Sequence, residues 1–328
     1  MITDLHIYHG VGFDPYQNLA TEKHLMDIVQ PGSCILYLWQ NQNTVVIGRN
    51  QNPWAECRIS LLEQEGGRLA RRLSGGGAVF HDLGNLNFTF LMNKEDYDLD
   101  RQVSVIQTAC SLAGIHAEKS GRNDLLADGR KFSGNAFYHN STHAYHHGTL
   151  MVDVDRDKLG RYLSPPKAKL EAKGVASVRS RVVNLKELAP DLTVEKMKKY
   201  IADAFCRVYG MQATPISLTE TDAEVIDRLH ADYSAWDYLF GTPLPLSFQC
   251  QAHFPWGNVQ IQLDAKDGKI TQLKVYSDSM DWSFPHTVEA ALTGCWFELA
   301  AMEAALKQTP LEAENITDLL GMLSAQLL

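Results

Sequence analysis

The stretch RRLSGGGAVFHD, residues Arg71–Asp82, places three consecutive glycines between two arginines and a short apolar run. Three glycines in a row are entropically costly in any regular element, and without Cβ atoms they let a ligand approach the main chain closely. Backbone N–H groups in such a turn can converge on an anion, and the guanidinium of Arg72 adds a planar, permanent charge. The stretch therefore predicts an anion-binding turn between two strands, with a flexible surface hairpin as the alternative.

The glycine pattern excludes two common phosphate-binding motifs. The spacing is not G-x-G-x-x-G, and no Gly-Lys-Ser/Thr closes the loop. Leu69 and Ala70 before the glycines, and Ala78–Phe80 after them, are typical of strands rather than of a helix. A phosphate site at this position would therefore be built on a sheet.

The composition is that of an ordinary globular protein. The 328 residues are 45% hydrophobic and 21% charged, which suits two domains or one large one. The formal net charge of −9 disfavours general nucleic-acid binding. Residues 251–328 hold four Lys/Arg against ten Asp/Glu, a net of −6, which leaves −3 for residues 1–250. The acidity belongs mostly to the C-terminal quarter.

The cysteines are widely spaced and form no C-x-x-C pair; they are Cys34, Cys57, Cys110, Cys206, Cys250 and Cys295. This pattern favours reduced thiols over disulfides or a zinc site. The first residues, Met1–Asp4, are neither basic nor strongly apolar, and no apolar run reaches 18 residues. We expect a cytoplasmic protein with no membrane segment.

The block Gly121–Gly134, GRNDLLADGRKFSG, reads as a hairpin because an Asp-Gly pair stands in its middle. That turn places Asp124 opposite Ser133 and on the same face as Leu126 and Lys131. A lysine and an aspartate on an interior sheet face are costly unless they serve a function. The alternative is a solvated outer face with an incidental ion pair, worth less than about 1 kcal/mol.

Hydrophobic periodicity predicts the other elements of the first 240 residues. Helices are expected over Asn18–Val29, with Asn18 as its cap, and over Glu56–Glu65, Val103–Ala113, Asp157–Tyr162, Val194–Tyr209 and Asp222–His230. Strands are expected over Ile35–Trp39, Thr44–Gly48, Asn87–Leu91 and Thr149–Val154, the last preceded by His146 and His147. No cysteine or carboxylate at ligand spacing joins this histidine pair, which favours a structural role over a metal site.

A basic segment and a linker complete the organisation. Leu170–Asn184 is polar and basic without a clear period, which is typical of a solvated loop or, beside an anion site, of a lid. The segment Gly241–Leu246 marks a linker, and we place the boundary there: a first domain over 1–245 and a small α+β domain over 246–328. The second domain is expected to contain a hairpin, Asn258–Leu263 with Ile270–Tyr276, and helices over Thr287–Lys307 and Ala313–Gln326.

Five blocks together carry a resemblance to a known family: Arg71–Asp82, Gly121–Asp124, Gly129–Ala136, His146–Leu150 and Ser177–Val182. With them the chain resembles the lipoate–protein ligases of the two-domain bacterial type over essentially its whole length. The resemblance implies an α/β (α+β) fold. Its catalytic domain would be a mixed sheet like those of biotin ligases and class II aminoacyl-tRNA synthetases, followed by a small α+β accessory domain.

The resemblance also implies a reaction in two steps. Lipoate and ATP give lipoyl-adenylate and pyrophosphate, with Mg²⁺, and the lipoyl group then passes to a lysine of a lipoyl-carrier domain. Such carriers occur in 2-oxoacid dehydrogenase complexes and as the glycine-cleavage carrier protein. No nucleic-acid or membrane partner is implied, and we expect a monomer.

The same resemblance assigns site residues. Lys131 would be the catalytic ammonium, which contacts both lipoate and nucleotide and stabilises the negative charge of the adenylation transition state. The ATP-binding set would be Arg72, Gly77, Ala78, Val79, Phe80, Asn123, Asp124, Lys131, Arg179 and Arg181. The lipoate-binding set would be Ser74, Gly75, His81, Lys131 and His147. Asp124 is the candidate Mg²⁺ ligand.

Two alternatives stay open. Lipoyl- and octanoyl-transferases share this fold, and some use a cysteine thioester, but no cysteine lies between Cys110 and Cys206, which disfavours a thiol relay. A non-catalytic lipoate-binding module would not need Asp124 and Lys131 on one face. Lipoate-dependent exchange between ATP and pyrophosphate would separate all three.

Overall fold

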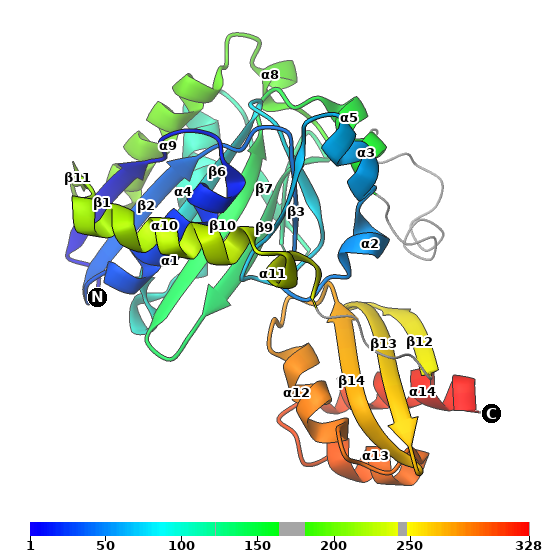
Figure 1. Ribbon diagram of the computed structural model, residues 1–328. Coiled ribbons are helices and arrows are strands. Elements are labelled where there is room, and N and C mark those ends of the chain that lie inside the picture. Colours follow the sequence, from blue (N-terminus) through cyan, green and yellow to red (C-terminus); the bar gives the residue numbers. More distant parts are fainter. Residues whose placement is uncertain (122, 164–180, 242–247, 328) are drawn as a thin grey trace.

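The computed structural model describes residues 1–121, 123–163, 181–241 and 248–327. Two bodies are visible in Figure 1: a large one built on an eight-stranded sheet, and a smaller C-terminal one below it. The predicted linker and most of the predicted basic loop lie outside the described residues, and the boundary at 245/246 stays a prediction. No helix in the described ranges is long and apolar enough to span a membrane.

The large sheet is mixed, as predicted, with the strand order β11-β1-β2-β6-β10-β9-β8-β7. β1 runs parallel to both β2 and β11, and the remaining neighbours are antiparallel. The strands are β1 (Asp4–His9), β2 (Ser33–Trp39), β6 (Asn85–Asn93), β7 (Glu118–Ser120), β8 (Asp124–Ala127), β9 (Arg130–His139), β10 (His143–Met151) and β11 (Ala213–Pro215).

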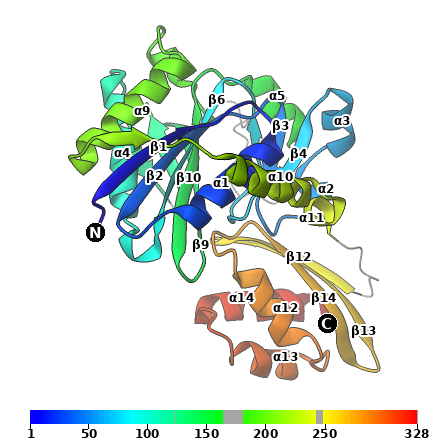
Figure 2. The same ribbon diagram turned by 60° about the vertical axis from the view of Figure 1, so that its left-hand side comes forward.

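Helices cover both faces of this sheet, as the two views show (Figures 1 and 2). On one face α4 (Leu99–Leu112) and α9 (Val194–Tyr209) pack on alternate residues of β2 and β6. On the other face α1 (Pro15–Ile28) packs on the intervening residues, with α10 (Glu220–Ser234) against it. Every residue of β2 is therefore buried, which explains why its sequence is apolar from Cys34 to Trp39.

A second sheet within the described residues has the order β4-β3-β5 and carries the glycine turn. Its strands are β3 (Thr44–Ile47), β4 (Arg68–Arg71) and β5 (Val79–His81). The strands on either side of the three glycines are thus not paired with each other, because β3 lies between them. The predicted strands on either side of Gln40–Asn43 also belong to two different sheets.

Short helices surround the second sheet: α2 (Pro53–Glu56), α3 (Ile59–Gln64), α5 (Arg156–Tyr162) and α11 (Trp236–Phe240). The single helix predicted over Glu56–Glu65 is wrong, because the chain is extended at Cys57, which bridges to Leu163. The elements η1 (Lys94–Asp96) and α8 (Leu185–Leu188) lie in connections of the large domain.

Two local predictions are corrected by burial and capping. Helix α1 begins at Pro15, and Asp14, four residues before Asn18, caps it by accepting from the amides of Tyr16 and Gln17. Asn18 is instead buried inside the helix. His146 and His147 lie within β10 rather than before a strand, so they point to opposite faces of the sheet.

The β8–β9 hairpin forms as predicted around Asp128 and Gly129, both with positive φ, but its register shifts. Leu126 pairs with Lys131 as expected, whereas Asp124 pairs with Gly134 and not with Ser133. Ser133 faces Leu125 and is buried. An irregularity between Leu125 and Leu126 causes the change, and a bulge of this kind has no signal in the turn sequence.

The C-terminal body has its own apolar core, formed by residues between Cys250 and Leu323. Its sheet comprises β12 (Phe248–Phe254), β13 (Gly257–Lys266) and β14 (Lys269–Ser277), and β13–β14 is the predicted hairpin. Its helices are α12 (Phe284–Leu292), α13 (Leu299–Leu306) and α14 (Ala313–Leu327). The helix predicted over Thr287–Lys307 is wrong because it breaks at Gly294, where φ is +85°.

Candidate active site

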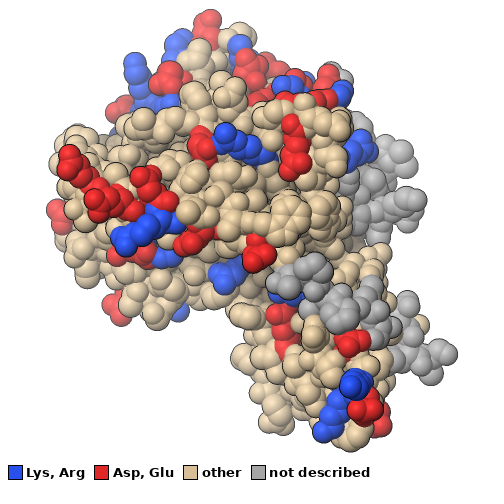
Figure 3. All heavy atoms as spheres, in the orientation of Figure 1, with Lys and Arg blue, Asp and Glu red and all other residues tan. Residues whose placement is uncertain are grey.

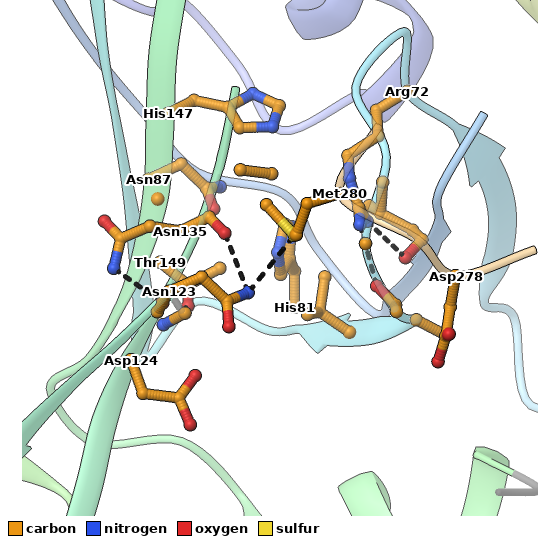
Figure 4. A pocket seen from close by; sticks show the side chains of 18 of the residues that line it. Arg72, His81, Asn87, Asn123, Asp124, Asn135, His147, Thr149, Asp278 and Met280 are labelled. Carbon is orange, nitrogen blue, oxygen red and sulfur yellow. Dashed lines mark hydrogen bonds between the residues drawn. The ribbon is translucent and has the colours of Figure 1, made fainter. Parts of the chain in front are cut away.

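A cavity of about 230 Å³ lies where the α1-covered face of the large sheet, the glycine turn and the β14–α12 connection meet (Figure 4). Its walls come from both bodies of the protein. The lining residues are Leu19, Trp39, Val46, Arg72, Gly76, Gly77, Ala78, Val79, His81, Asn87, Asn123, Asp124, Lys131, Gly134, Asn135, Ala136, His147, Gly148, Thr149, Asp278 and Met280.

Arg72 holds the glycine turn in shape from within. Its Nε lies 3.0 Å from Ser74 Oγ, and its Nη2 donates to the carbonyl oxygens of Gly75 at 2.7 Å and Gly77 at 2.8 Å. Burial lowers the pKa of this guanidinium to about 10, so it keeps its charge at neutral pH. In this conformation Arg72 stabilises the shape of the turn through these hydrogen bonds, a role that the sequence did not indicate.

Gly75 is needed for close contact with neighbouring main chain, and Gly76 for its positive φ of +86°. A Cβ on Gly75 would lie 2.4 Å from the carbonyl oxygen of Ser279, and the amide of Gly76 donates to that oxygen at 3.1 Å. Met280 follows, with its sulfur 3.7 Å from Nδ2 of Asn123 (Figure 4). The β14–α12 connection therefore packs directly on the turn.

Lys131 and Asp124 face each other across the β8–β9 hairpin, as predicted. Lys131 Nζ lies 2.6 Å from Asp124 Oδ1, and each side chain is more than one-third exposed. Because Gly134 has no side chain, Nζ has room beside β9; a Cβ at Gly134 would lie 3.2 Å from it. This arrangement places a partly exposed point charge at the rim of the cavity, where an anionic ligand could replace its carboxylate partner.

A buried hydrogen-bonded chain supports the opposite wall. His147 lies with Nδ1 2.9 Å from Glu22 Oε1 and Nε2 2.8 Å from Ser74 Oγ. Thr89 donates to the same Glu22 oxygen at 2.7 Å. All four side chains are less than one-tenth exposed. The chain ties α1 and β10 to the glycine turn, and it reaches Arg72 through Ser74.

Nine of the predicted site residues line this cavity: Arg72, Gly77, Ala78, Val79, His81, Asn123, Asp124, Lys131 and His147. Ser74 and Phe80 are buried behind it, and Gly75 faces the β14–α12 connection. Arg181 lies at the start of the described segment after residue 180 and is not among the lining residues. Arg179 falls outside the described residues.

Two groups of lining residues lie outside the set predicted from the sequence. Trp39 and Asn87 read as ordinary strand residues, although a buried polar Asn87 between apolar neighbours was a usable signal. Asp278 and Met280 come from the C-terminal body, outside the blocks on which the site prediction rests. No local sequence pattern in that acidic segment predicts its contact with the glycine turn, which lies about two hundred residues earlier in the chain.

The donors suit one hard cation at most. Asp124 and Asp278 are the carboxylates that line the cavity, and the described residues contain no cluster of three or more potential metal ligands. Mg²⁺ commonly takes one or two carboxylates and completes its shell with water and substrate phosphates. Asp124 fits this pattern, since its carboxylate lines the cavity and is more than one-third exposed.

No cysteine lies among the residues that line the cavity. All six thiols are free, and four of them are buried. Burial raises the pKa of Cys34, Cys57 and Cys110 to about 12 and that of Cys250 to about 11, so these are poor nucleophiles. The arrangement disfavours a thioester relay at this site.

Comparison with known proteins defines the class. Residues 14–206 match the family model of the lipoyl protein ligase A/B catalytic domain, so the chain belongs to the lipoyl protein ligase A/B family. Residues 245–320 match the model of the bacterial lipoate protein ligase C-terminus. This pair of matches is that of the two-domain lipoate–protein ligases, which confirms the resemblance noted in the sequence.

Solved structures share the fold. P. falciparum LipL1 in complex with lipoate is 23% identical with a TM-score of 0.84, over 97% of this chain and 98% of that one. A bi-partite lipoate protein ligase from Thermoplasma acidophilum, described with its E2 lipoyl domain, is 24% identical with a TM-score of 0.66, over 76% and 100%. A lipoate-protein ligase A bound with ATP is 24% identical with a TM-score of 0.64, over 74% and 99%.

Proposed function

We propose that this protein activates lipoate with ATP to lipoyl-adenylate and then transfers the lipoyl group to a lysine of a lipoyl-carrier domain. The observation that carries the proposal is the pair Lys131–Asp124, 2.6 Å apart at the rim of a cavity that the glycine turn also lines. A cavity that only bound lipoate would have no need of this charged pair. Family membership supports the same assignment.

In the first step a carboxylate oxygen of lipoate attacks the α-phosphorus of ATP, and pyrophosphate leaves. Negative charge accumulates between two anionic reactants, and the ammonium of Lys131 stabilises it without transferring a proton. The turn Gly77–Phe80 with Arg72 is proposed to bind the nucleotide, together with Asn123 and Asp124. Arg181 remains a proposed nucleotide contact, as does Arg179.

Mg²⁺ is proposed to neutralise charge on the phosphates when it is bound, with Asp124 as its protein ligand. With its carboxylate on the metal, Asp124 would no longer pair with Lys131, and the ammonium would be free to contact the carboxylate of lipoate and the α-phosphate. Ser74, Gly75, His81 and His147 are the proposed lipoate side of the cavity. Of these, Ser74 acts through His147, since it is fully buried.

In the second step the amine of a carrier lysine attacks the acyl carbon, and AMP leaves. Carriers of the 2-oxoacid dehydrogenase complexes or of the glycine-cleavage system are the proposed partners. The T. acidophilum ligase, described together with an E2 lipoyl domain, supports this choice.

The surface in Figure 3 carries acidic and basic side chains interspersed. A monomeric state and a cytoplasmic location remain predictions, the latter in keeping with six free thiols.

The test measures exchange of pyrophosphate into ATP with and without lipoate, followed by mass spectrometry for the adenylate. We expect exchange that requires lipoate and an adenylate that disappears when a carrier domain is added. Exchange that is absent with every acid, while lipoate still binds, would support a binding module. Acyl transfer from an acylated carrier without ATP would support a transferase.

A further inference from the structure

We propose that Asn87 and His81 form a neutral pair of donors that binds the acyl oxygen of the substrate, the oxygen that is not transferred to the phosphate. This inference rests on the proposed function. It adds a residue, Asn87, and gives His81 a defined chemical state. Both side chains line the cavity and are at least nine-tenths buried.

Both residues present a polar atom that lacks a protein partner. Nε2 of His81 and Nδ2 of Asn87 are buried and make no hydrogen bond within the described part of the chain. Asn85 donates to Oδ1 of Asn87 at 2.9 Å, which leaves Nδ2 as the unused end of the amide. Two buried atoms without partners are costly, and both lie at the cavity, where a ligand can satisfy them.

A chain of hydrogen bonds fixes the tautomer of His81. Nδ2 of Asn18 donates to the carbonyl oxygen of Gln40 at 2.8 Å and to Oδ1 of Asn41 at 2.9 Å, so Asn41 must turn its Nδ2 toward His81. That Nδ2 lies 3.1 Å from Nδ1 of His81. Since the amide nitrogen only donates, Nδ1 accepts and the ring proton is on Nε2.

The pairing of the strands places Asn87 beside the reacting end of the cavity. Asn87 is opposite Trp39 on one side and Thr149 on the other, so these three form a row across the sheet. Thr149 accepts from the amide of Gly134 at 3.2 Å, and Gly134 is the residue over which Lys131 Nζ lies. Adjacent strands are about 4.8 Å apart, so Asn87 stands one strand from Thr149 and two strands, about 10 Å, from Gly134 and the ammonium above it.

The chemistry of lipoate indicates which of its groups meets Asn87 and His81. Lipoate has strong acceptors only at its carboxylate, and its sulfurs accept weakly. Lys131 on one side and the two neutral donors on the other would turn the carboxylate so that one oxygen faces the phosphate. When a lysine amine later adds to the acyl carbon, negative charge develops on the held oxygen, and neutral donors stabilise it there until AMP leaves with the electron pair of the broken C–O bond.

The test compares Asn87→Leu with Asn93→Leu in the full-length protein. Asn93 is on the same strand and also has a buried Nδ2 without a partner in the described residues, but it does not line the cavity. We expect Asn87→Leu to weaken binding of both lipoate and octanoate by about tenfold, the loss of roughly one hydrogen bond to a charged group. Asn93→Leu should leave binding of both acids unchanged.

His81 is tested by its two amide replacements. The amide nitrogen of glutamine reaches the position of Nε2, and that of asparagine reaches Nδ1. His81→Gln should therefore retain binding within about threefold, whereas His81→Asn should lose about tenfold. In the wild-type protein, ¹⁵N NMR should show the proton on Nε2, with its signal shifted by octanoate.

Three outcomes would overturn the inference. Equal binding by Asn87→Leu and the wild type would show that the amide does not meet the substrate. A loss confined to lipoate would show that the donors meet the dithiolane sulfurs. A proton on Nδ1 of His81, or a signal unmoved by octanoate, would remove the second donor. If the wild type makes an adenylate in all these cases, only the inference fails; if it binds neither acid, the proposed function fails with it.

Discussion

The amide of Gly76 donates a hydrogen bond of 3.1 Å to the carbonyl oxygen of Ser279, which joins the glycine turn to the C-terminal body. Around this bond, the ring of Trp282 lies 5.1 Å from that of Tyr138, and Arg49 stacks over the same indole at 5.1 Å. Nδ2 of Asn50 also donates to the carbonyl of Trp282 at 2.7 Å. The turn proposed to bind the nucleotide thus supports a domain contact at the same time.

We predict that Gly75→Ala separates the two bodies. The new Cβ would meet the Ser279 carbonyl oxygen at 2.4 Å, so one of the two main-chain segments would have to move. Small-angle X-ray scattering should show a larger radius of gyration, with the helical content unchanged. Gly160→Ala is the control, since a Cβ there meets nothing within 4 Å. Identical scattering from both variants would contradict the contact.

Removal of the C-terminal body after Leu246 should affect the two half-reactions unequally. Without the β14–α12 connection the wall formed by Asp278 and Met280 is lost, so adenylate formation should fall. Transfer from pre-formed lipoyl-adenylate to a carrier should be partly retained, because Lys131 and the glycine turn remain. The two steps are assayed separately on protein checked for folding by circular dichroism. Equal loss of both would make the body part of a common site; no loss would make it dispensable.

Lys131→Ala should reduce adenylate formation at least about 100-fold, because the ammonium stabilises charge that develops only in the transition state. Lys131→Arg should be nearly as inactive, since a planar guanidinium cannot occupy the position of a point charge. The matched control is Arg130→Ala, the adjacent cation, which pairs with Asp128 and Glu187 outside the cavity. Near-normal exchange by either Lys131 variant would contradict its assignment.

Stability should rise with pH between about 3 and 6.5. Burial lowers the pKa of His81 and of His146 to about 3. In this window the unfolded chain has protonated both rings and the folded chain has not, so the unfolded state binds more protons. Each histidine then contributes at most about 1.4 kcal/mol per pH unit to the slope of the unfolding free energy.

Urea denaturation from pH 4.5 to 7.5 measures this slope. His146→Gln should flatten it by the share of one histidine, whereas His116→Gln, at an exposed ring, should not. His146 is the better choice because, unlike His81, it does not line the cavity; it packs against Phe88 and Phe90. A slope equal to that of the wild type after His146→Gln would exclude this histidine as its source.

Much of the site could be predicted because its signals are local. The Asp-Gly turn at 128–129 sets which residues of β8 and β9 share a face, so Asp124 and Lys131 were brought together correctly. Helix α9 was predicted residue for residue because its apolar positions follow one face. Both features depend on residues that are close together in the sequence.

The features that were missed depend on tertiary contacts. Asp14 caps α1 only because the preceding loop turns there, and the sequence offers Asn18 as an equally good capping residue. The bulge in β8–β9 depends on packing of Phe132 in the core, which the turn does not specify. Met280 reaches the cavity through the docking of one body on another, for which a single sequence carries no pattern.

The positions of the cysteines bear on whether the disulfide of lipoate stays closed in the site. Lipoate carries a five-membered cyclic disulfide, and thiolates open disulfides by exchange through a mixed-disulfide intermediate. With no cysteine lining the cavity, and burial holding four thiols protonated at neutral pH, the described walls of the site offer the ring no attacking sulfur. Under the proposed function, the site would hold this cyclic disulfide without being oxidised by it, and the ring would reach the carrier in the redox state in which it arrived.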